Sequence, residues 1–176
     1  MNEADILGKS LKRTQNLLSL RLCDNLVDDD IMKFLVEGLN MNISLMHLDL
    51  SHNRISNEGA RRIAKFLMRN EMVTELNLCD NLIAMQGTIF IGHSLKFNTN
   101  LQTLNLKLNR ICDMSGERFF KDIQNNKTLT DLDMSSNGLS TMTADKICDL
   151  ISNPLCTLKS LDISANNFSD KSYDML

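Results

Sequence analysis

The chain has 176 residues, of which 43% are hydrophobic and 5% aromatic, so its core should be a single, mostly aliphatic one. Its formal net charge of -3 argues against a nucleic-acid surface, because such a surface needs clustered Lys and Arg. No apolar run approaches the roughly 18 residues of a membrane span, and the N-terminus carries acidic residues where a secretion signal would be basic and then apolar. We therefore expect one soluble, cytoplasmic domain over residues 1–176.

The first sixteen residues have the pattern of a helix. Ala4, Leu7 and Leu11 are spaced three and four residues apart, which places them on one helical face. We interpret residues 1–16 as the helical half of a repeat whose strand is missing.

A repeat then begins at Leu17 and returns at steps of 28, 28, 28, 28 and 29 residues. Each copy follows the pattern LxxLxLxxNx(I/L/V), in which alternation such as Leu48-Asp49-Leu50 predicts a short strand with its leucines inward. Asparagine at the following bend can satisfy backbone groups that would otherwise be buried unpaired. We expect a structural ladder, with no ligand, from Asn25, Asn53, Asn81, Asn109, Asn137 and Asn166.

Between the strands the apolar period changes to that of a helix. In the second repeat Ala60, Ile63, Ala64 and Leu67 share one face, and Ser56 is placed to cap the helix. Glycine falls where strand and helix should pack closely, at Gly59 and Gly87. The matching core positions in later repeats are Ile91, Leu95, Phe119, Phe120, Ile123, Ala144, Ile147, Cys148 and Ile151.

The repeats divide the domain into five full copies over residues 17–157 and a terminal strand with the start of a helix over 158–176. The 29-residue step contains Pro154 and predicts a lengthened helix-to-strand turn. Neither end has the polar surface of a capping unit. We expect the ends to be covered by further repeats of a longer chain or by other proteins.

The repeat resembles the ribonuclease-inhibitor class of leucine-rich repeats over essentially the whole chain. Six strand-helix copies predict an α/β solenoid, with a parallel sheet on the concave face and helices on the convex face. The stack should curve into a horseshoe, because a helix is wider than the spacing between strands.

Three stretches are similar to the leucine-rich-repeat subunit family of the nexin-dynein regulatory complex. They are LVDDDIMKFL from Leu26, LDLSHNRISNEGARRIAKFL from Leu48 and LNLKLNRICDMSGE from Leu104, and the apolar Leu108 before a repeat asparagine is a further shared feature. The resemblance implies a structural protein of the ciliary or flagellar axoneme that helps to link doublet microtubules and to regulate dynein. Its partners would be other subunits of that complex and possible microtubule-associated proteins, with no cofactor and no small-molecule substrate.

The predicted concave face is polar and small, and it lacks the aromatic anchors of tight protein interfaces, since the chain has no Trp and its one Tyr is Tyr173. Its acidic end, formed by Asp131, Asp133 and Asp162, can either steer a basic partner segment or be an ordinary solvated surface.

On the helical side, Phe34 and Phe90 occupy the position that Arg62, Arg118 and Lys146 fill in other repeats. An apolar ring among cations suggests a partner contact, although a single exposed ring can also have no role.

We expect no enzyme activity and no metal site. The histidines His47 and His52 flank Asp49 as any alternating strand and its bend would place them, with no nucleophile in a sharp turn. The five cysteines, Cys23, Cys79, Cys112, Cys148 and Cys156, lack a CxxC pair and are expected to be reduced thiols.

Two other functions use the same repeat class. One is a GTPase-activating protein for a nuclear-transport GTPase, for which Arg54 and Arg110 are the basic candidates after the asparagines. The other is the sensor part of an innate-immune receptor, which would need a nucleotide-binding domain elsewhere. The expected function is a non-catalytic scaffold that binds proteins.

Overall fold

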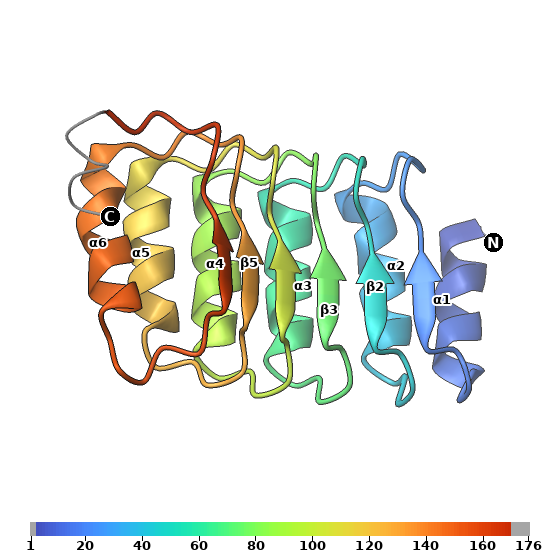
Figure 1. Cartoon of the computed structure of the whole chain (residues 1–176). Coiled ribbons are helices and arrows are strands. Elements are labelled where there is room, and N and C mark those ends of the chain that lie inside the picture. The colour runs from blue at the N-terminus through green and yellow to red at the C-terminus, as the bar shows by residue number, and fades with distance from the viewer. Residues whose placement is uncertain (1–2, 170–176) are drawn as a thin grey trace.

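The computed structural model describes residues 3–169 as a curved stack of strand-helix units (Figure 1). The helices, each of 11 residues, are α1 (Glu3–Arg13), α2 (Asp29–Leu39), α3 (Asn57–Leu67), α4 (Met85–Leu95), α5 (Asp113–Ile123) and α6 (Thr141–Ile151). The strands are β1 (Ser19–Arg21), β2 (His47–Asp49), β3 (Glu75–Asn77), β4 (Thr103–Asn105), β5 (Asp131–Asp133) and β6 (Ser160–Asp162). None of these helices is long and apolar enough to cross a membrane.

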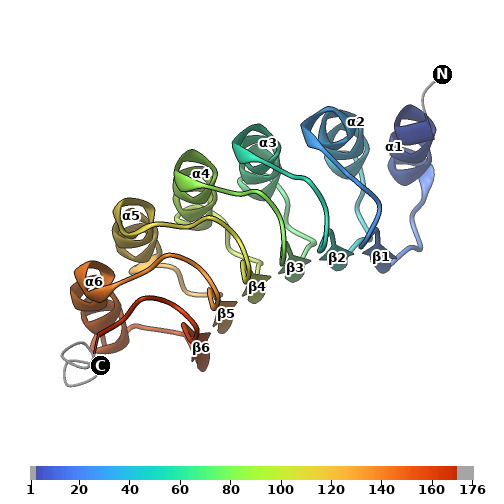
Figure 2. The same cartoon turned by 90° about the horizontal axis from the view of Figure 1, so that it is seen from above.

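The six strands form one parallel sheet in chain order, from β1 to β6. The register follows the repeat, so that Leu48 pairs with Leu76, Leu76 with Leu104 and Leu104 with Leu132. Seen from above, the helices form the outer, convex layer and the strands form the inner, concave one (Figure 2). The predicted α/β leucine-rich-repeat solenoid is confirmed.

The core lies between the two layers and is filled by aliphatic side chains. The middle leucine of each strand from β2 to β5 is buried, as is the third apolar residue of the pattern, for example Leu50 and Leu78. Phe119 and Phe120 of α5 are also fully buried and meet edge to face, with ring centroids 5.8 Å apart. Each repeat buries its apolar face mainly against its neighbours, which is why the stack behaves as one core.

The chain leaves every strand through a residue in the left-handed backbone region, with φ between 51° and 58°. This residue directly precedes the repeat asparagine, and it is never glycine. The position carries Asp24, His52, Asp80, Leu108, Ser136 and Ala165. Leucine adopts this conformation only at an energetic cost, so Leu108 is the member that the fold itself explains least.

Two helix expectations need correction. Ser56 stands at the N-cap of α3, but its hydroxyl donates to Oδ2 of Asp29 in the preceding repeat and does not cap its own helix. In α6, Leu150 is buried while Ile151 is 45% exposed, the reverse of the expected pattern. The extra residue of the 29-residue step lies just beyond, in the turn between α6 and β6.

Candidate functional site

The concave face presents two columns of side chains from the outward positions of the strands. The first column is Ser19, His47, Glu75, Thr103, Asp131 and Ser160, and the second is Arg21, Asp49, Asn77, Asn105, Asp133 and Asp162. A shallow hollow of about 520 Å³ lies over β1 to β4. Nδ1 of His47 lies 2.9 Å from a carboxylate oxygen of Glu75 across this hollow.

Side chains of the second column are engaged in closing the turns that follow their own strands. The carboxylate of Asp133 accepts from the backbone N–H and the hydroxyl of Ser135, at 2.9 and 2.6 Å. Asp49 does the same with Ser51, and Asn77 and Asn105 accept from the N–H two residues later. These acceptors therefore have a local structural role that periodicity alone did not reveal.

The three acidic residues proposed for partner steering lie close together. Asp133 of β5 pairs in register with Asp162 of β6, and Asp131 is on the same face of β5. Hydrogen bonds from the hydroxyl and the N–H of Ser164 lower the pKa of Asp162, which keeps it ionised. Asp131 accepts from the Thr130 hydroxyl at 2.6 Å. The cluster is thus negative, but much of its hydrogen-bonding capacity is used within the chain.

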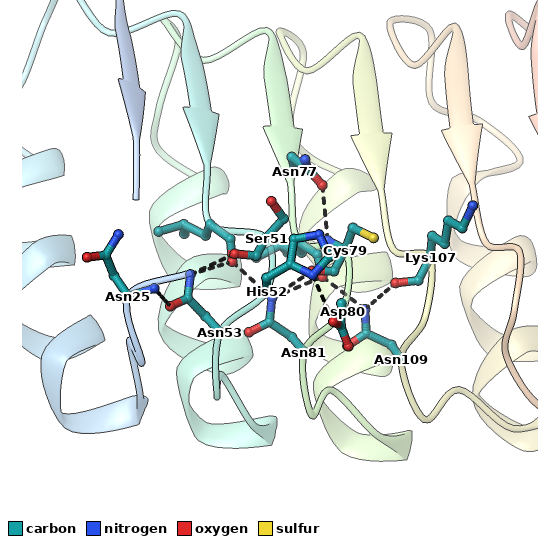
Figure 3. A network of polar contacts seen from close by, with 12 residues as sticks. Asn25, Ser51, His52, Asn53, Asn77, Cys79, Asp80, Asn81, Lys107 and Asn109 are labelled. Carbon is teal, nitrogen blue, oxygen red and sulfur yellow. Dashed lines mark hydrogen bonds and ion pairs between the residues drawn. The ribbon is translucent and has the colours of Figure 1, made fainter. Parts of the chain in front are cut away.

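The repeat asparagines join neighbouring repeats. Oδ1 of Asn81 accepts from the N–H of Ile55, and its Nδ2 donates to the carbonyls of Leu50, Leu78 and Cys79 (Figure 3). Equivalent bonds to a preceding repeat are made by Asn53, Asn109, Asn137 and Asn166. Asn25, in the first repeat, is exposed, and its Nδ2 donates to the carbonyl of Cys23 within the same repeat.

Two further columns of cross-repeat bonds escaped the sequence analysis. At the helix-to-strand turns, Nδ2 of Asn42, Asn98 and Asn126 donates to a carbonyl 31 residues earlier. At the helix N-termini, Asp29 accepts from the N–H groups of Ser56 and Gly59 in the next repeat. The recurrence of asparagine at positions 42, 70, 98 and 126 is the signal that could have revealed the first of these.

The second of these columns includes Asp113, which accepts from the Ser140 N–H and hydroxyl and from the Thr143 hydroxyl. Burial alone would raise the pKa of Asp113, but the hydrogen bonds from Thr143 and Ser140 outweigh it and lower the pKa. Gly59 and Gly87 pack against this column, because an added Cβ would meet Asp29 or Asn57 within 3 Å.

On the edge of the sheet, the left-handed positions bring His52 and Asp80 together (Figure 3). Nδ1 of His52 lies 2.8 Å from Oδ2 of Asp80, and this hydrogen bond raises the pKa of the imidazole. Both side chains are about half exposed. The pair has neither an adjacent nucleophile nor an enclosing pocket, so its geometry is that of a surface ion pair.

Phe34 and Phe90 do not project freely into water as expected, because both are half-buried. Phe34 lies where α1 approaches α2, and its backbone carbonyl lies against Gly8. The Lys33 ammonium is 5.8 Å from the centre of its ring. The more exposed aromatic ring is Phe97, at 52%, which follows α4.

Toward the two ends of the described chain the strand residues are less covered. Leu20 in β1 and Leu161 in β6 are half-buried, whereas the equivalent leucines of β2 to β5 are buried. None of the five cysteines takes part in a disulfide within the described residues. Within residues 3–169, no group of three His, Cys, Asp or Glu side chains is arranged to hold a metal ion.

Comparison with known proteins agrees with this geometry. Four stretches, residues 42–64, 97–115, 125–141 and 155–172, match the family model described as Leucine Rich repeat. The chain contains leucine-rich repeats. No curated protein sequence matches it.

Among solved structures, the leucine-rich-repeat chain is similar to one described as leiomodin-1 actin-binding site 2, with 22% identity and a TM-score of 0.74 over 87% of this chain and 90% of that one. A tropomodulin C-terminal domain from Caenorhabditis elegans has 14% identity and a TM-score of 0.67, over 76% and 83% of the two chains. An internalin from Listeria monocytogenes has 19% identity and a TM-score of 0.52, over 88% of this chain and 43% of that one. At these identities the likeness establishes the fold.

Proposed function

We propose that this chain is a non-catalytic scaffold that holds other proteins in a cytoskeletal assembly. The observation that carries the proposal is the placement of exposed apolar side chains. Met114 and Met142, on the adjacent helices α5 and α6, are each 68% exposed, and Ile43 in the turn after α2 is 64% exposed. Apolar groups in the outer layer and at its rim, beside a polar concave sheet, favour protein contacts through the helical side.

We further propose that the assembly is the nexin-dynein regulatory complex of motile cilia, with this chain in the role of its leucine-rich-repeat subunit, subunit five. The residue that best supports this is Leu108, which is 45% exposed and has a left-handed φ of 53°. Other repeats place polar or small residues there, so an exposed leucine has no benefit for the fold. A partner contact would account for it.

The stretch LVDDDIMKFL, which also supports the resemblance, contains three consecutive aspartates, and two of them have a structural role. Asp28 caps α2 by accepting from the N–H groups of Asp30 and Ile31, and Asp29 joins the next repeat. Asp28 and Asp30 are both exposed, and Asp30 is the one of the three whose carboxylate makes neither a capping bond nor a cross-repeat bond.

A second candidate function is binding to actin. Its support is the similarity to the structure described as leiomodin-1 actin-binding site 2, which extends over most of both chains. The first candidate predicts association with doublet microtubules, and the second predicts association with actin filaments.

The test is retention on axonemes. A tagged chain expressed in ciliated cells should stay with isolated doublet microtubules after washing in high salt, and the Leu108→Asn variant should be retained less. Recovery of the parent chain only in the soluble cytosol would contradict the ciliary proposal. Co-sedimentation of the purified chain with actin filaments, and not with axonemes, would favour the second candidate.

A further inference from the structure

A groove runs between α2 and α3 on the outer face, where the two helices lie side by side (Figure 2). Its volume is about 610 Å³. One wall comes from α2 and the residue after it, and the other from α3 and the turn that follows. The lining residues are Lys33, Val36, Glu37, Asn40, Arg62, Lys65, Met68 and Arg69.

The groove is strongly basic in a chain whose net charge is negative. Four of its lining residues are cations and one, Glu37, is an acid. Arg62 shares the carboxylate of Glu58 with Arg61, at 3.1 and 2.6 Å. One carboxylate therefore serves two guanidinium groups, and positive charge remains in excess.

The remaining cations are free to meet a ligand. Lys33, Lys65 and Arg69 make no ion pair with any acid in residues 3–169, and all three are exposed. In addition, Nε of Arg62 is shielded from solvent and has no hydrogen-bond partner within the described chain. An anionic ligand in the groove would pair with the exposed ammonium and guanidinium groups through charge-assisted hydrogen bonds.

Apolar side chains continue from the basic walls toward the rim. Val36 is buried beneath the groove, and Met68 is 43% exposed beside it. A second hollow of about 220 Å³ shares Asn40 and Arg69 with the groove and includes Ile43. The surface thus combines cations with adaptable apolar groups.

We propose that this groove binds a short acidic segment of a partner protein, whose carboxylates meet Arg62, Lys65 and Arg69 and whose apolar side chain packs on Met68. Charge complementarity identifies the occupant, because the lining offers cations and an apolar contact together. The lining has no aromatic ring on which a nucleic-acid base could stack. The inference rests on the proposed function in assigning the outer face to protein binding.

Arg62 and Lys65 are three residues apart on α3, about 4.5 Å along its axis, and Arg69 lies in the turn just after the helix. A partner helix with carboxylates repeated every three or four residues would therefore place two of them along this wall.

The test uses a fluorescent amphipathic peptide with glutamates along one face and leucines beside them. The same peptide with glutamine in place of glutamate is the matched ligand. The purified chain should bind the glutamate peptide, with affinity that falls as salt is added, and should bind the glutamine peptide much more weakly.

The decisive variant is Lys65→Glu with Arg69→Glu, which should weaken binding by about tenfold or more. Lys96→Glu with Lys121→Glu is the matched control, because it reverses the charge of two exposed lysines outside the groove. Lys96 directly follows α4, and Lys121 lies in α5. Met68→Gln should also weaken binding. If the Lys65→Glu, Arg69→Glu variant does not fold, Lys65→Gln with Arg69→Gln should also weaken binding, because it removes the two positive charges without adding negative ones.

Equal binding of the two peptides, or equal loss in groove and control variants, would overturn the inference. So would saturable binding of single-stranded RNA or phosphatidylserine vesicles through these residues in place of the peptide. A chain that stays on axonemes but ignores the peptide refutes the groove alone. A chain that binds the peptide but is free in the cytosol refutes the ciliary function alone.

Discussion

Oδ1 of Asn81 accepts a hydrogen bond from the backbone N–H of Ile55, 26 residues earlier, at 2.9 Å. The Asn81 side chain is buried, and its Nδ2 also bonds to the carbonyl of Leu50 in the preceding repeat. One amide therefore satisfies a donor and an acceptor that have no access to water, and it ties two repeats together.

Removing this amide should weaken the whole stack. We expect Asn81→Ala to lower the free energy of unfolding by about 1 to 3 kcal/mol, because buried backbone groups are left unpaired. Asn77→Ala is the comparison, since half-buried Asn77 accepts only a local bond from the Cys79 N–H at 3.0 Å. Urea unfolding measures both, and equal losses would refute the ladder as the joint between repeats.

The strand core should not tolerate charge. Leu78 is completely buried, so Leu78→Asp would place an unpaired carboxylate among aliphatic side chains and should abolish cooperative folding. Asn77→Asp is the matched control on the adjacent position, where other repeats already have Asp49 and Asp133. Thermal melting followed by circular dichroism separates them. A Leu78→Asp chain that melts within a few degrees of the parent would show that the inward face is wrongly assigned.

Acid should weaken the hydrogen bonds by which Asp113 connects its repeat to Ser140 and Thr143 of the next one. Because folding lowers the pKa of Asp113, its ionised form stabilises the protein above the ordinary value near 3.8, and this stabilisation is lost as pH falls through the lowered value. Asp113→Asn keeps an acceptor, as Asn57 does in another repeat, but has no charge.

The variant should be less stable than the parent at neutral pH, and the difference should shrink below about pH 4. Urea unfolding over a pH series measures it, with exposed Asp145→Asn as the control. A difference that stays constant down to pH 2 would contradict the role of the ionised carboxylate.

The repeat length made most of the fold predictable, because a constant 28-residue step requires neighbouring strands to pair in register, as Leu48 and Leu76 do. Contacts between repeats were harder to predict. The roles of Asp29 and Asn42 depend on how closely one helix or turn approaches the next, and a single repeat does not specify that distance. The same applies to Phe34, which lies where α1 approaches α2. The basic groove combines residues of two repeats and was not found from either one.

Partner binding should depend on the outer face. Changing Phe34 and Phe90 to Arg, the residue found at the same position in α3 and α5, should reduce incorporation into the assembly. Because both rings are half-buried, a melting curve must accompany the pull-down so that lost stability is not read as lost binding. Asp131→Lys with Asp133→Lys tests the concave face, and we expect it to have little effect. Loss of partners in the Asp variant alone would reverse the assignment of the faces.

The most direct test of the central claim is lysine cross-linking of the chain within native axonemes, followed by mass spectrometry. If the outer layer holds the partners, cross-links to other proteins should form at Lys33 of α2 and at Lys65 of α3. Lys107 and Lys159 lie next to β4 and β6 and report on the sheet side. Partner cross-links confined to Lys107 and Lys159, with none at Lys33 or Lys65, would contradict the account.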